Sequence, residues 1–490
     1  MSGTRLALTI EAPVLDESLS WNALESLVVA MSHEVPARAL ALVLEDAQER
    51  LIEAACGPRW TPVRGLTAPF GCPGCGARDD FARKGRRTRP RKLHTAAGTV
   101  ELILWHVGCR GCRRNFAPLL VMLGLSGKRR TDRLTLDLAE LGTQMSFARA
   151  ARVDAALAGT GATAGQAHGA MADVAALLTG TGTPEPEQGA GDRPGDDDPG
   201  AGHGGVGRSA LVRDGQVERP GVLGHGHPSP RVVLMDGTGA RAGDKTNGVG
   251  VNLAVGLTGR SGPAGRRRAH THLLGLTVGQ DWSMMGAQLQ DLPAPALVVV
   301  DGETAITVLA QRLWPAAPIQ RCWWHLPHGL RKAFYVDDAN DRHVNPRWAR
   351  TMAGALAELM REQIRNEHTT TQALAAWDAF AERIPATLTS AHAYLDAARP
   401  HAFTCLDPAL RRALAHLGGP ELGTGVLERL MRELNARTDI GGVRWTIPGL
   451  RDLLTVLTAR ALRHPAWTEI HRNTRPANTI QFRLQKFNAT

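Results

Sequence analysis

Apolar residues recur at helical spacing in the first part of the chain and at strand spacing farther along. Residues 14–56 have the helical pattern, as in ARALALVLEDAQERLIEAA. Three short helices are predicted between residues 133 and 178, with Ser146 as the N-cap of the second. After residue 230 the pattern becomes that of strands, in RVVLM, VGVNLAVGLT and HTHLLGLTV. The sequence therefore joins a helical part to a part that contains a sheet.

The elements that follow these strands predict an α/β layer. A helix (DWSMMGAQLQDL) precedes the apolar run ALVVV, which leads into Asp301; then come a helix (ETAITVLAQRLW), a short strand (PIQRC) and a helix that begins near Trp324. Because every residue of ALVVV is apolar, we expect helices to cover this strand on both faces. From residue 345 to about residue 415 the pattern is mostly helical.

Four of the seven cysteines form two Cys-x-x-Cys pairs, Cys72 with Cys75 and Cys109 with Cys112. A pair on a tight turn can direct two thiolates to one metal ion, and two such turns complete the tetrahedral set of a zinc ribbon. Seven cysteines are too few for a disulfide scaffold in so long a chain. We therefore expect the four thiolates to bind Zn²⁺, the alternative being four unrelated thiols.

Between the two cysteine pairs, seven of the ten residues at positions 83–92 are basic: Arg83, Lys84, Arg86, Arg87, Arg89, Arg91 and Lys92. Guanidinium groups match phosphate oxygens, so we expect DNA backbone contacts, with a solvated loop as the alternative. The formal charge of +10 is compatible with a nucleic-acid partner and also with ordinary solubility. The three short helices are typical of a helix-turn-helix, although any small bundle would have the same pattern.

The sequence shows no sign of a membrane or a secretory pathway. No apolar run approaches the ~20 residues of a membrane span. The N-terminal residues lack the ordered regions of a signal peptide. A soluble, cytoplasmic protein is the expectation.

Two apolar strands lead into the same dipeptide, Asp-Gly, at Asp236 and Asp301. Either dipeptide alone is more typical of a hairpin turn than of a site. The element order can place the two strands side by side, and this favours a pair of carboxylate ligands for Mg²⁺. Each strand is expected to end at its aspartate.

A third acidic residue, Glu428, lies at the flank of the apolar stripe in the predicted helix VLERLMRELNART. Periodicity allows it to reach the strand ends. It equally allows Glu428 to be a surface partner of Arg432, and Glu433 to be a partner of Arg437.

The motifs VLMDGT, VVVDGE, QRCWWH and GTGVLERLMRELNART, in this order, resemble those of DDE transposases of the Mutator-like bacterial insertion-sequence kind. These enzymes have an RNase H-like catalytic core. The resemblance covers about residues 70–465 and implies that Asp236, Asp301 and Glu428 form a catalytic triad that binds Mg²⁺ (or Mn²⁺). The glycine-rich lead before LER selects Glu428 over Glu433. The long Gly/Pro/Asp-rich segment before the first aspartate departs from the family pattern.

The resemblance implies a transposase that binds the terminal inverted repeats of a mobile element, cleaves DNA and transfers strands to target DNA. Two metal ions about 3.5 to 4 Å apart would serve both phosphodiester steps. The implied partners are DNA and further copies of the chain in a homodimer or higher oligomer, at the bacterial nucleoid. Two alternatives remain, a DNA-binding regulator that has lost catalysis and an RNase H-like nuclease that cuts without joining.

Cys322 and His325 form a Cys-x-x-His that resembles the family's motif after the second aspartate. With His401 or Cys405 they could complete a zinc site, but a packed thiol and a hydrogen-bonded histidine are favoured. The two tryptophans between them are expected in the core, with stacking on a displaced base as the alternative.

The expected fold class is α/β, an RNase H-like core with a large helical insertion, preceded by a zinc ribbon and a helix-turn-helix domain. A length of 490 residues suits about three domains. The expected divisions are an N-terminal helical region (1–60), the ribbon (61–125), the helix-turn-helix (126–179), a disordered Gly/Pro/Asp-rich linker (180–229), the first part of the core (230–335), the insertion (336–420), the C-terminal core helices with Glu428 (421–470) and a tail (471–490).

Overall fold

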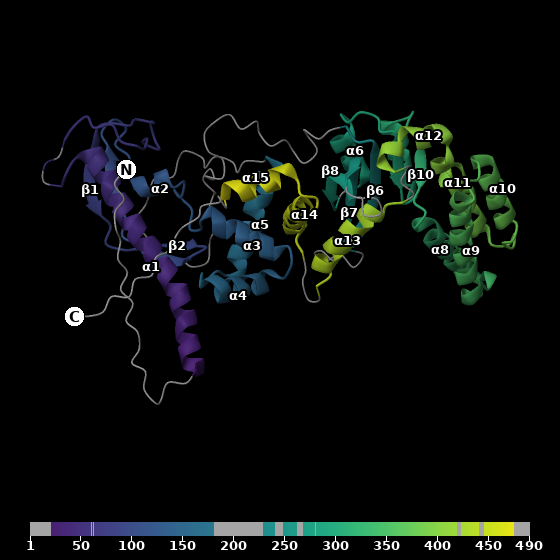
Figure 1. Cartoon of the computed structure of the whole chain (residues 1–490), viewed down its shortest axis with the longest axis horizontal. Helices are drawn as coiled ribbons and strands as arrows, with labels where there is room; N and C mark the ends of the chain where they lie inside the picture. Colours follow the sequence, from purple (N-terminus) through teal and green to yellow (C-terminus); the bar gives the residue numbers. More distant parts are fainter. Residues whose placement is uncertain are drawn as a thin grey trace. The chain divides into compact units, whose positions relative to one another are not determined.

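The computed structural model describes residues 21–59, 61, 63–180, 229–240, 248–261, 268–279, 281–418, 423–440 and 445–474. The protein is of mixed α/β class and divides into two compact units (Figure 1). Unit 1 comprises residues 1–219 together with 465–490, and unit 2 comprises residues 220–464. The linker expected at residues 180–229 lies outside the described residues except at its two ends.

The first described element of unit 1 is a long helix, α1 (Trp21–Cys56), and small antiparallel sheets follow it. Strands β1 (Phe81–Arg86), β4 (Trp105–Cys109) and β5 (Asn115–Phe116) form one sheet, and β2 (Arg91–Thr95) and β3 (Gly98–Leu102) form a hairpin. The side chain of Gln48 on α1 bonds to the backbone of Ile103 and of Trp105, so it ties the helix to the link between β3 and β4. A short helix, α2 (Pro118–Met122), follows the ribbon.

Three helices complete the N-terminal part of unit 1: α3 (Asp132–Gly142), α4 (Phe147–Ala158) and α5 (Ala164–Thr179). Ser146 caps α4, as the sequence predicts, by accepting a hydrogen bond from the Arg149 amide. The three helices pack around small and branched apolar side chains, Leu134, Leu138, Ala167 and Ala170. This packing is common to a helix-turn-helix and to a simple three-helix bundle.

The last described helix, α15 (Pro465–Thr474), belongs to unit 1 although it follows unit 2 in the chain. It packs against α3, and its apolar side chains Trp467 and Ile470 are buried. The end of the region expected at residues 421–470 therefore lies in unit 1, together with the first residues of the expected tail.

Unit 2 is built on a sheet that, in the described residues, has five strands in the order β10-β9-β6-β7-β8. These are β6 (Val232–Ala240), β7 (Val249–Ser261), β8 (Arg268–Val278), β9 (Leu297–Val300) and β10 (Ile319–Arg321). The first three pair antiparallel, and β9 and β10 run parallel to β6. The strands lie where the apolar pattern predicts them.

Helices cover both faces of this sheet. On one face α6 (Trp282–Leu289) and α7 (Thr304–Leu313) pack on Val233, Met235 and their neighbours. On the other, α13 (Gly425–Thr438) contacts β6, where Thr238 and Asn435 hydrogen-bond at 3.3 Å, and α14 (Ile447–Ala461) contacts β8. Because side chains alternate along a strand, Asp236 faces the same side as Thr238. The first aspartate thus points to the face that carries α13.

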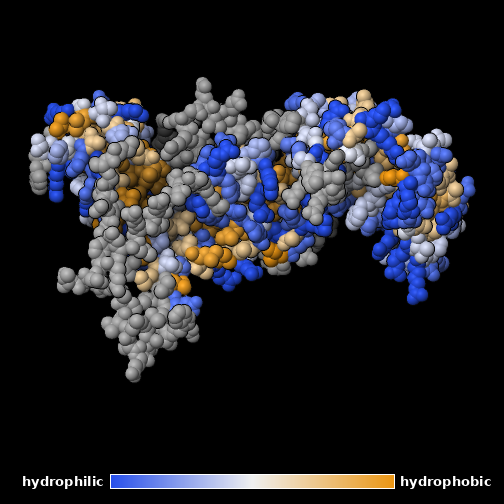
Figure 2. Space-filling view, in the orientation of Figure 1, coloured by the Kyte–Doolittle hydropathy of each residue, from blue (hydrophilic) through white to orange (hydrophobic). Residues whose placement is uncertain are grey.

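The region between β10 and α13 is helical, as expected, with its own apolar core around Phe334, Trp377 and Phe380. Its elements are α8 (His325–Asp337), a π-helical turn (Asp338–Arg342), α9 (Pro346–Arg365), α10 (Thr370–Ala381), α11 (Thr389–Ala402) and α12 (Pro408–Ala413), with 3₁₀ turns at Thr404–Leu406 and Ala415–Leu417. Figure 1 shows α8 to α11 grouped beside the sheet, and Figure 2 shows a mainly hydrophilic surface over α9 and α10.

None of the described helices is both long enough and apolar enough to cross a membrane.

Candidate metal centres

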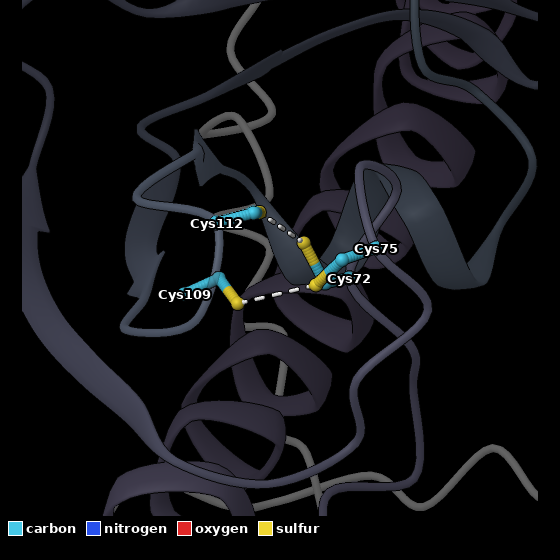
Figure 3. A group of neighbouring side chains, drawn as sticks. All are labelled: Cys72, Cys75, Cys109 and Cys112. Carbon is cyan, nitrogen blue, oxygen red and sulfur yellow. Dashed lines mark hydrogen bonds between the residues drawn. The ribbon is translucent and has the colours of Figure 1, made fainter.

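The four cysteines of the two Cys-x-x-Cys pairs converge in unit 1 (Figure 3). All four sulfur atoms lie within 4.8 Å of one another, with 3.4 Å between Cys72 and Cys112 and 3.6 Å between Cys75 and Cys109. These separations exceed the ~2.05 Å of a disulfide bond, and all four thiols are free. Four thiolates at ~2.3 Å from a tetrahedral zinc ion would be about 3.8 Å apart, so the cluster fits Zn²⁺.

The two turns that carry these thiols have the same backbone geometry. In each, the amide of the first cysteine bonds to the carbonyl five residues on, Cys72 to Ala77 at 2.8 Å and Cys109 to Arg114 at 2.9 Å. The residue after each second cysteine has a positive φ, +75° at Gly76 and +61° at Arg113. Two equivalent turns that face each other present two pairs of sulfur atoms to one point.

The backbone around the first turn stabilises a thiolate. Burial raises the pKa of the Cys72 thiol, but hydrogen bonds from the Gly74 and Cys75 amides and from neighbouring thiols lower it to about 7 overall. The Gly74 amide lies 3.4 Å from Cys72 Sγ. The turn thus favours the thiolate that zinc requires at Cys72. At Cys75 the Ala77 amide lowers the pKa, but the neighbouring thiols outweigh it and raise that pKa to about 11, so in the absence of metal the proton stays on the second cysteine.

Part of the basic run at residues 83–92 contacts the protein itself. Arg83 donates a hydrogen bond to the Gly57 carbonyl at 2.8 Å, and Arg86 forms an ion pair with Glu49 at 2.6 Å. Both guanidinium groups lie over the ring of Trp105, at 5.4 and 4.8 Å from its centre. These two arginines therefore join α1 to the ribbon sheet.

Two further residues of the basic run, Arg91 and Lys92, also contact the protein itself. Arg91 donates to the Lys128 carbonyl at 2.7 Å, and Lys92 forms an ion pair with Glu101 at 2.9 Å. Five side chains of the run are exposed to solvent, including the ion-paired Arg86 and Lys92; the other three are Lys84, Arg87 and Arg89. The run thus combines structural contacts with an exposed basic group.

The second cluster lies at the edge of the sheet in unit 2, where β6 and β9 are neighbours. Met235 of β6 is in register with Val300 of β9, so Asp236 and Asp301 follow paired residues of two parallel strands. Asp236 is 3% exposed, and Asp301 is half-buried beside it. The structure therefore brings the two aspartates to one place.

The two Asp-Gly dipeptides differ in structure. At Asp301 the strand ends, and Gly302 has a φ of +106° before α7 begins. At Asp236 the chain neither turns nor ends its strand, because β6 continues to Ala240 with Gly237 paired to Asn252. The expectation that the first strand ends at Asp236 is wrong, and so is the hairpin-turn alternative, because β7 is long enough to pair with these extra residues.

Glu428 approaches Asp236 from the first turn of α13, whereas Asp301 is not part of the compact group that these two residues form. The Glu428 carboxylate, that of Asp236 and the imidazole of His325 form a group whose ligand atoms all lie within 4.8 Å of one another. Glu433, one and a half turns later on the same helix, is exposed. Of the two glutamates, Glu428 is the one that faces the sheet edge.

The start of α13 is fixed against the Cys-x-x-His segment. The Thr424 amide donates to Cys322 Sγ at 3.3 Å, and the Thr424 hydroxyl donates to Glu428 Oε1 at 3.3 Å. A side chain at Gly423 would lie 3.2 Å from Cys322 Sγ, so only glycine fits easily there. The glycine-rich segment at residues 423–425 and the Cys322 thiol together fix the position of Glu428.

The sequence favours a hydrogen-bonded histidine at His325, with half of a zinc site as the alternative, and the structure places His325 within this second cluster. Its Nε2 is 3.1 Å from Glu428 Oε1. Within the described part of the chain, neither His401 nor Cys405 joins Cys322 and His325 in a metal-ligand group. Cys322 is a fully buried thiol bonded to Thr424, so the favoured interpretation of the motif describes its packing well. The Cys-x-x-His spacing was the signal that could have identified His325 as a site residue.

The two tryptophans of the motif differ from each other. Trp323 packs on Phe403 and donates to the Ala402 carbonyl at 2.7 Å, as expected of a core residue. Trp324 is 55% exposed and stacks on His328 with 4.2 Å between ring centres. The expectation of a core position is wrong for Trp324, because it lies at the solvent-facing start of α8.

The charges of Asp236, Glu428 and His325 in the second cluster depend on one another. Burial raises the pKa of Asp236 to about 7, with help from the charges of Asp301 and Glu428 and against the effect of His325. Burial lowers the pKa of His325, but the Cys322 thiol, Asp236 and Glu428 outweigh it and raise that pKa to about 9. Clustered carboxylates repel one another, and a metal ion would relieve this repulsion. The arrangement can therefore hold a metal ion between β6, α8 and α13.

Comparisons with protein-family models and with curated proteins gave no match for this chain.

Proposed function

We propose that this protein is a DNA transposase of the DDE type, with an RNase H-like catalytic core in unit 2. The proposal rests on one observation above all: the carboxylates of Asp236 and Glu428, from distant parts of the chain, meet at one edge of the sheet, and Asp301 follows the neighbouring parallel strand in register with Asp236. The two aspartates come first in the chain, beside paired residues of parallel strands, and the glutamate lies on a late helix. This is the order that the motif resemblance implies.

The topology of the sheet supports the same assignment. Along the chain, three antiparallel strands precede two parallel ones, and the order in the sheet is β10-β9-β6-β7-β8. This arrangement is the one expected of an RNase H-like core. The helical region between β10 and α13 occupies the place of the large insertion. The fold alone would suit many activities, so the carboxylates carry the argument.

In this proposal Asp236, Asp301 and Glu428 hold Mg²⁺ or Mn²⁺, which would activate water or a 3′-hydroxyl and stabilise the leaving oxygen. The chain itself positions the carboxylates. Asp236 is fixed by the sheet and by the Gly237 amide, which lies 2.8 Å from its Oδ1. Asp301 is fixed by the Glu303 amide at 2.8 Å, and Glu428 by Thr424.

Unit 1 would supply DNA binding. The exposed side chains Lys84, Arg87 and Arg89 on the zinc ribbon are suited to phosphate contacts. Helix α5 contains no lysine or arginine, whereas α4 has two exposed arginines, Arg149 and Arg152. Contacts from the three-helix region to the DNA backbone would therefore be expected from α4 and not from α5.

The decisive experiment uses labelled DNA that carries the terminal inverted repeats flanking the coding sequence, with Mg²⁺ or Mn²⁺. Cleavage followed by joining to a target supports a transposase; cleavage alone indicates a nuclease, and binding alone indicates a regulator. Asp236→Asn, Asp301→Asn and Glu428→Gln should each abolish cleavage and keep DNA binding. Glu433→Gln is the matched control on the same helix, and it should remain active. Full activity of any triad variant would remove that residue from the site.

A further inference from the structure

His325 is held where it could act as a ligand and not only as a neighbour of the carboxylates. The imidazole projects from the first residue of α8, and Nε2 lies 3.1 Å from Glu428 Oε1. Together with a carboxylate oxygen of Asp236, these atoms form a compact donor set of one nitrogen and two oxygens. The three residues come from β6, α8 and α13, so the fold brings them together from three separate elements.

The separation between nitrogen and oxygen suits two ligands of one ion. Adjacent ligands at ~2.1 Å from an octahedral metal ion lie about 3.0 Å apart. The observed 3.1 Å between Nε2 and Oε1 is close to this value. An ion bound there would replace the contact between the two side chains, with little movement of either.

The other ring nitrogen of His325 faces the protein. Nδ1 is fully buried and makes no hydrogen bond with the described residues, while the Cys322 thiol raises the pKa of the ring. A polar group usually fixes the second nitrogen of a histidine that binds metal, and Cys322 is the polar side chain that interacts with this ring. Cys322 is itself held by Thr424, so the segment that positions Glu428 also positions the imidazole.

The geometry points to His325 as a nitrogen ligand of one of the two divalent metal ions in the catalytic site, with Asp236 and Glu428 as its oxygen ligands. This inference rests on the proposed function for the presence of metal. It makes the two metal positions chemically unequal. The position held by Asp236, His325 and Glu428 would be a mixed one, whereas a position at Asp301 would have oxygen ligands alone. Imidazole suits transition metals better than Mg²⁺, so the mixed position should prefer Mn²⁺.

The test is pulsed electron paramagnetic resonance of Mn²⁺ bound to the full chain, whose ribbon has been saturated with zinc. We expect a ¹⁴N coupling from a directly bound imidazole, replaced by a ¹⁵N coupling when the protein is made with ¹⁵N-histidine. In His325→Ala the coupling should disappear and the Mn²⁺ affinity should fall at least about tenfold. Substitution of residues around other metal sites lowers metal affinity by similar factors. His328→Ala, one turn later on α8, should change neither quantity.

The outcomes separate this inference from the proposed function. Mn²⁺ binding that requires Asp236 but shows no histidine nitrogen coupling in the unaltered protein would overturn the role of His325 and leave the carboxylate site intact. Absence of any Asp236-dependent Mn²⁺ binding would overturn both. The isotope measurement needs no variant, so it remains decisive even if His325→Ala fails to fold.

Discussion

Gly302, the residue after Asp301, is predicted to be essential for the shape of the sheet edge at which Asp236 and Asp301 lie. Its φ of +106° lies in a region that side chains rarely adopt, and a methyl group there would fall inside the Arg321 guanidinium. That guanidinium donates to the Gly302 carbonyl at 2.9 Å. The substitution Gly302→Ala must therefore both strain the backbone and displace Arg321.

The magnitude follows from these two effects. A side chain in a sparsely populated backbone region costs about 1 to 3 kcal/mol, and loss of a hydrogen bond to a charged group costs about 1.5 to 3 kcal/mol. Gly302→Ala should therefore destabilise unit 2 by about 2.5 to 6 kcal/mol, a large share of the 5 to 15 kcal/mol typical of a folded protein. Asp301 would lose its fixed position together with the turn.

Gly237, the residue after Asp236, is the matched control. It lies within β6, its φ is not positive, and an added methyl group would come no closer than 3.4 Å to another atom, Asn252 Oδ1. Gly237→Ala should be neutral or slightly stabilising, since alanine in a strand is favoured over glycine by roughly 0.5 to 1 kcal/mol.

The assay is hydrogen exchange in increasing urea, followed by mass spectrometry of peptides that cover β9 and β10. This gives the free energy of opening of that part of unit 2, independently of unit 1. A Gly302→Ala protein within about 0.5 kcal/mol of the unaltered chain, or equal to Gly237→Ala, would refute the reasoning.

Three further predictions concern the ribbon, the basic run and the helical region. Cys109→Ser should reduce bound zinc from about one ion per chain to none and unfold the ribbon. Cys56 is a buried thiol outside the cluster, so Cys56→Ala should keep its zinc. Metal analysis of the purified proteins measures the zinc content of both variants. Lys84→Ala should weaken DNA binding and lower the slope of log affinity against log salt by about one, while Arg91→Ala should chiefly lower the melting temperature, because Arg91 bonds to the Lys128 carbonyl. Asp337→Ala should lower the free energy of unfolding of the helical region in urea by about 2 to 4 kcal/mol. The buried Asp337 carboxylate accepts hydrogen bonds from the Ser390 and Ala391 amides, both at 3.0 Å, at the start of α11. Asp337→Asn should lower the free energy of unfolding less, and an equal decrease in the two variants would contradict a capping role.

Much of the fold could be predicted from local patterns. The apolar run at β9, the alternation in β6 to β8 and the cap at Ser146 are properties of neighbouring residues, so the sequence shows them directly. The cysteine spacing likewise predicts a four-thiol cluster, because each pair is a local turn. The meeting of Asp236 with Glu428 depends on motif order, since nothing local to either residue specifies the contact.

What could not be predicted depends on contacts between distant segments. That β6 passes straight through Asp236 is decided by the length of β7, its partner. The partners of Arg83 and Arg86 lie on α1 and at its end, so the composition of the run gave no sign of them. The place of His325 beside Glu428 requires α8 and α13 to meet, which periodicity in either helix does not reveal.

The return of α15 to α3 has a consequence for how the protein can be divided. Unit 2 is inserted into unit 1, so the chain enters and leaves it by two separate crossings, after residue 219 and after His464. A fragment that stops at residue 219 would lack α15 and leave the surface of α3 beneath Trp467 and Ile470 open to water. A fragment of unit 1 that folds well should instead carry α15 rejoined through a short flexible link, and loss of α15 should destabilise unit 1 before it affects unit 2.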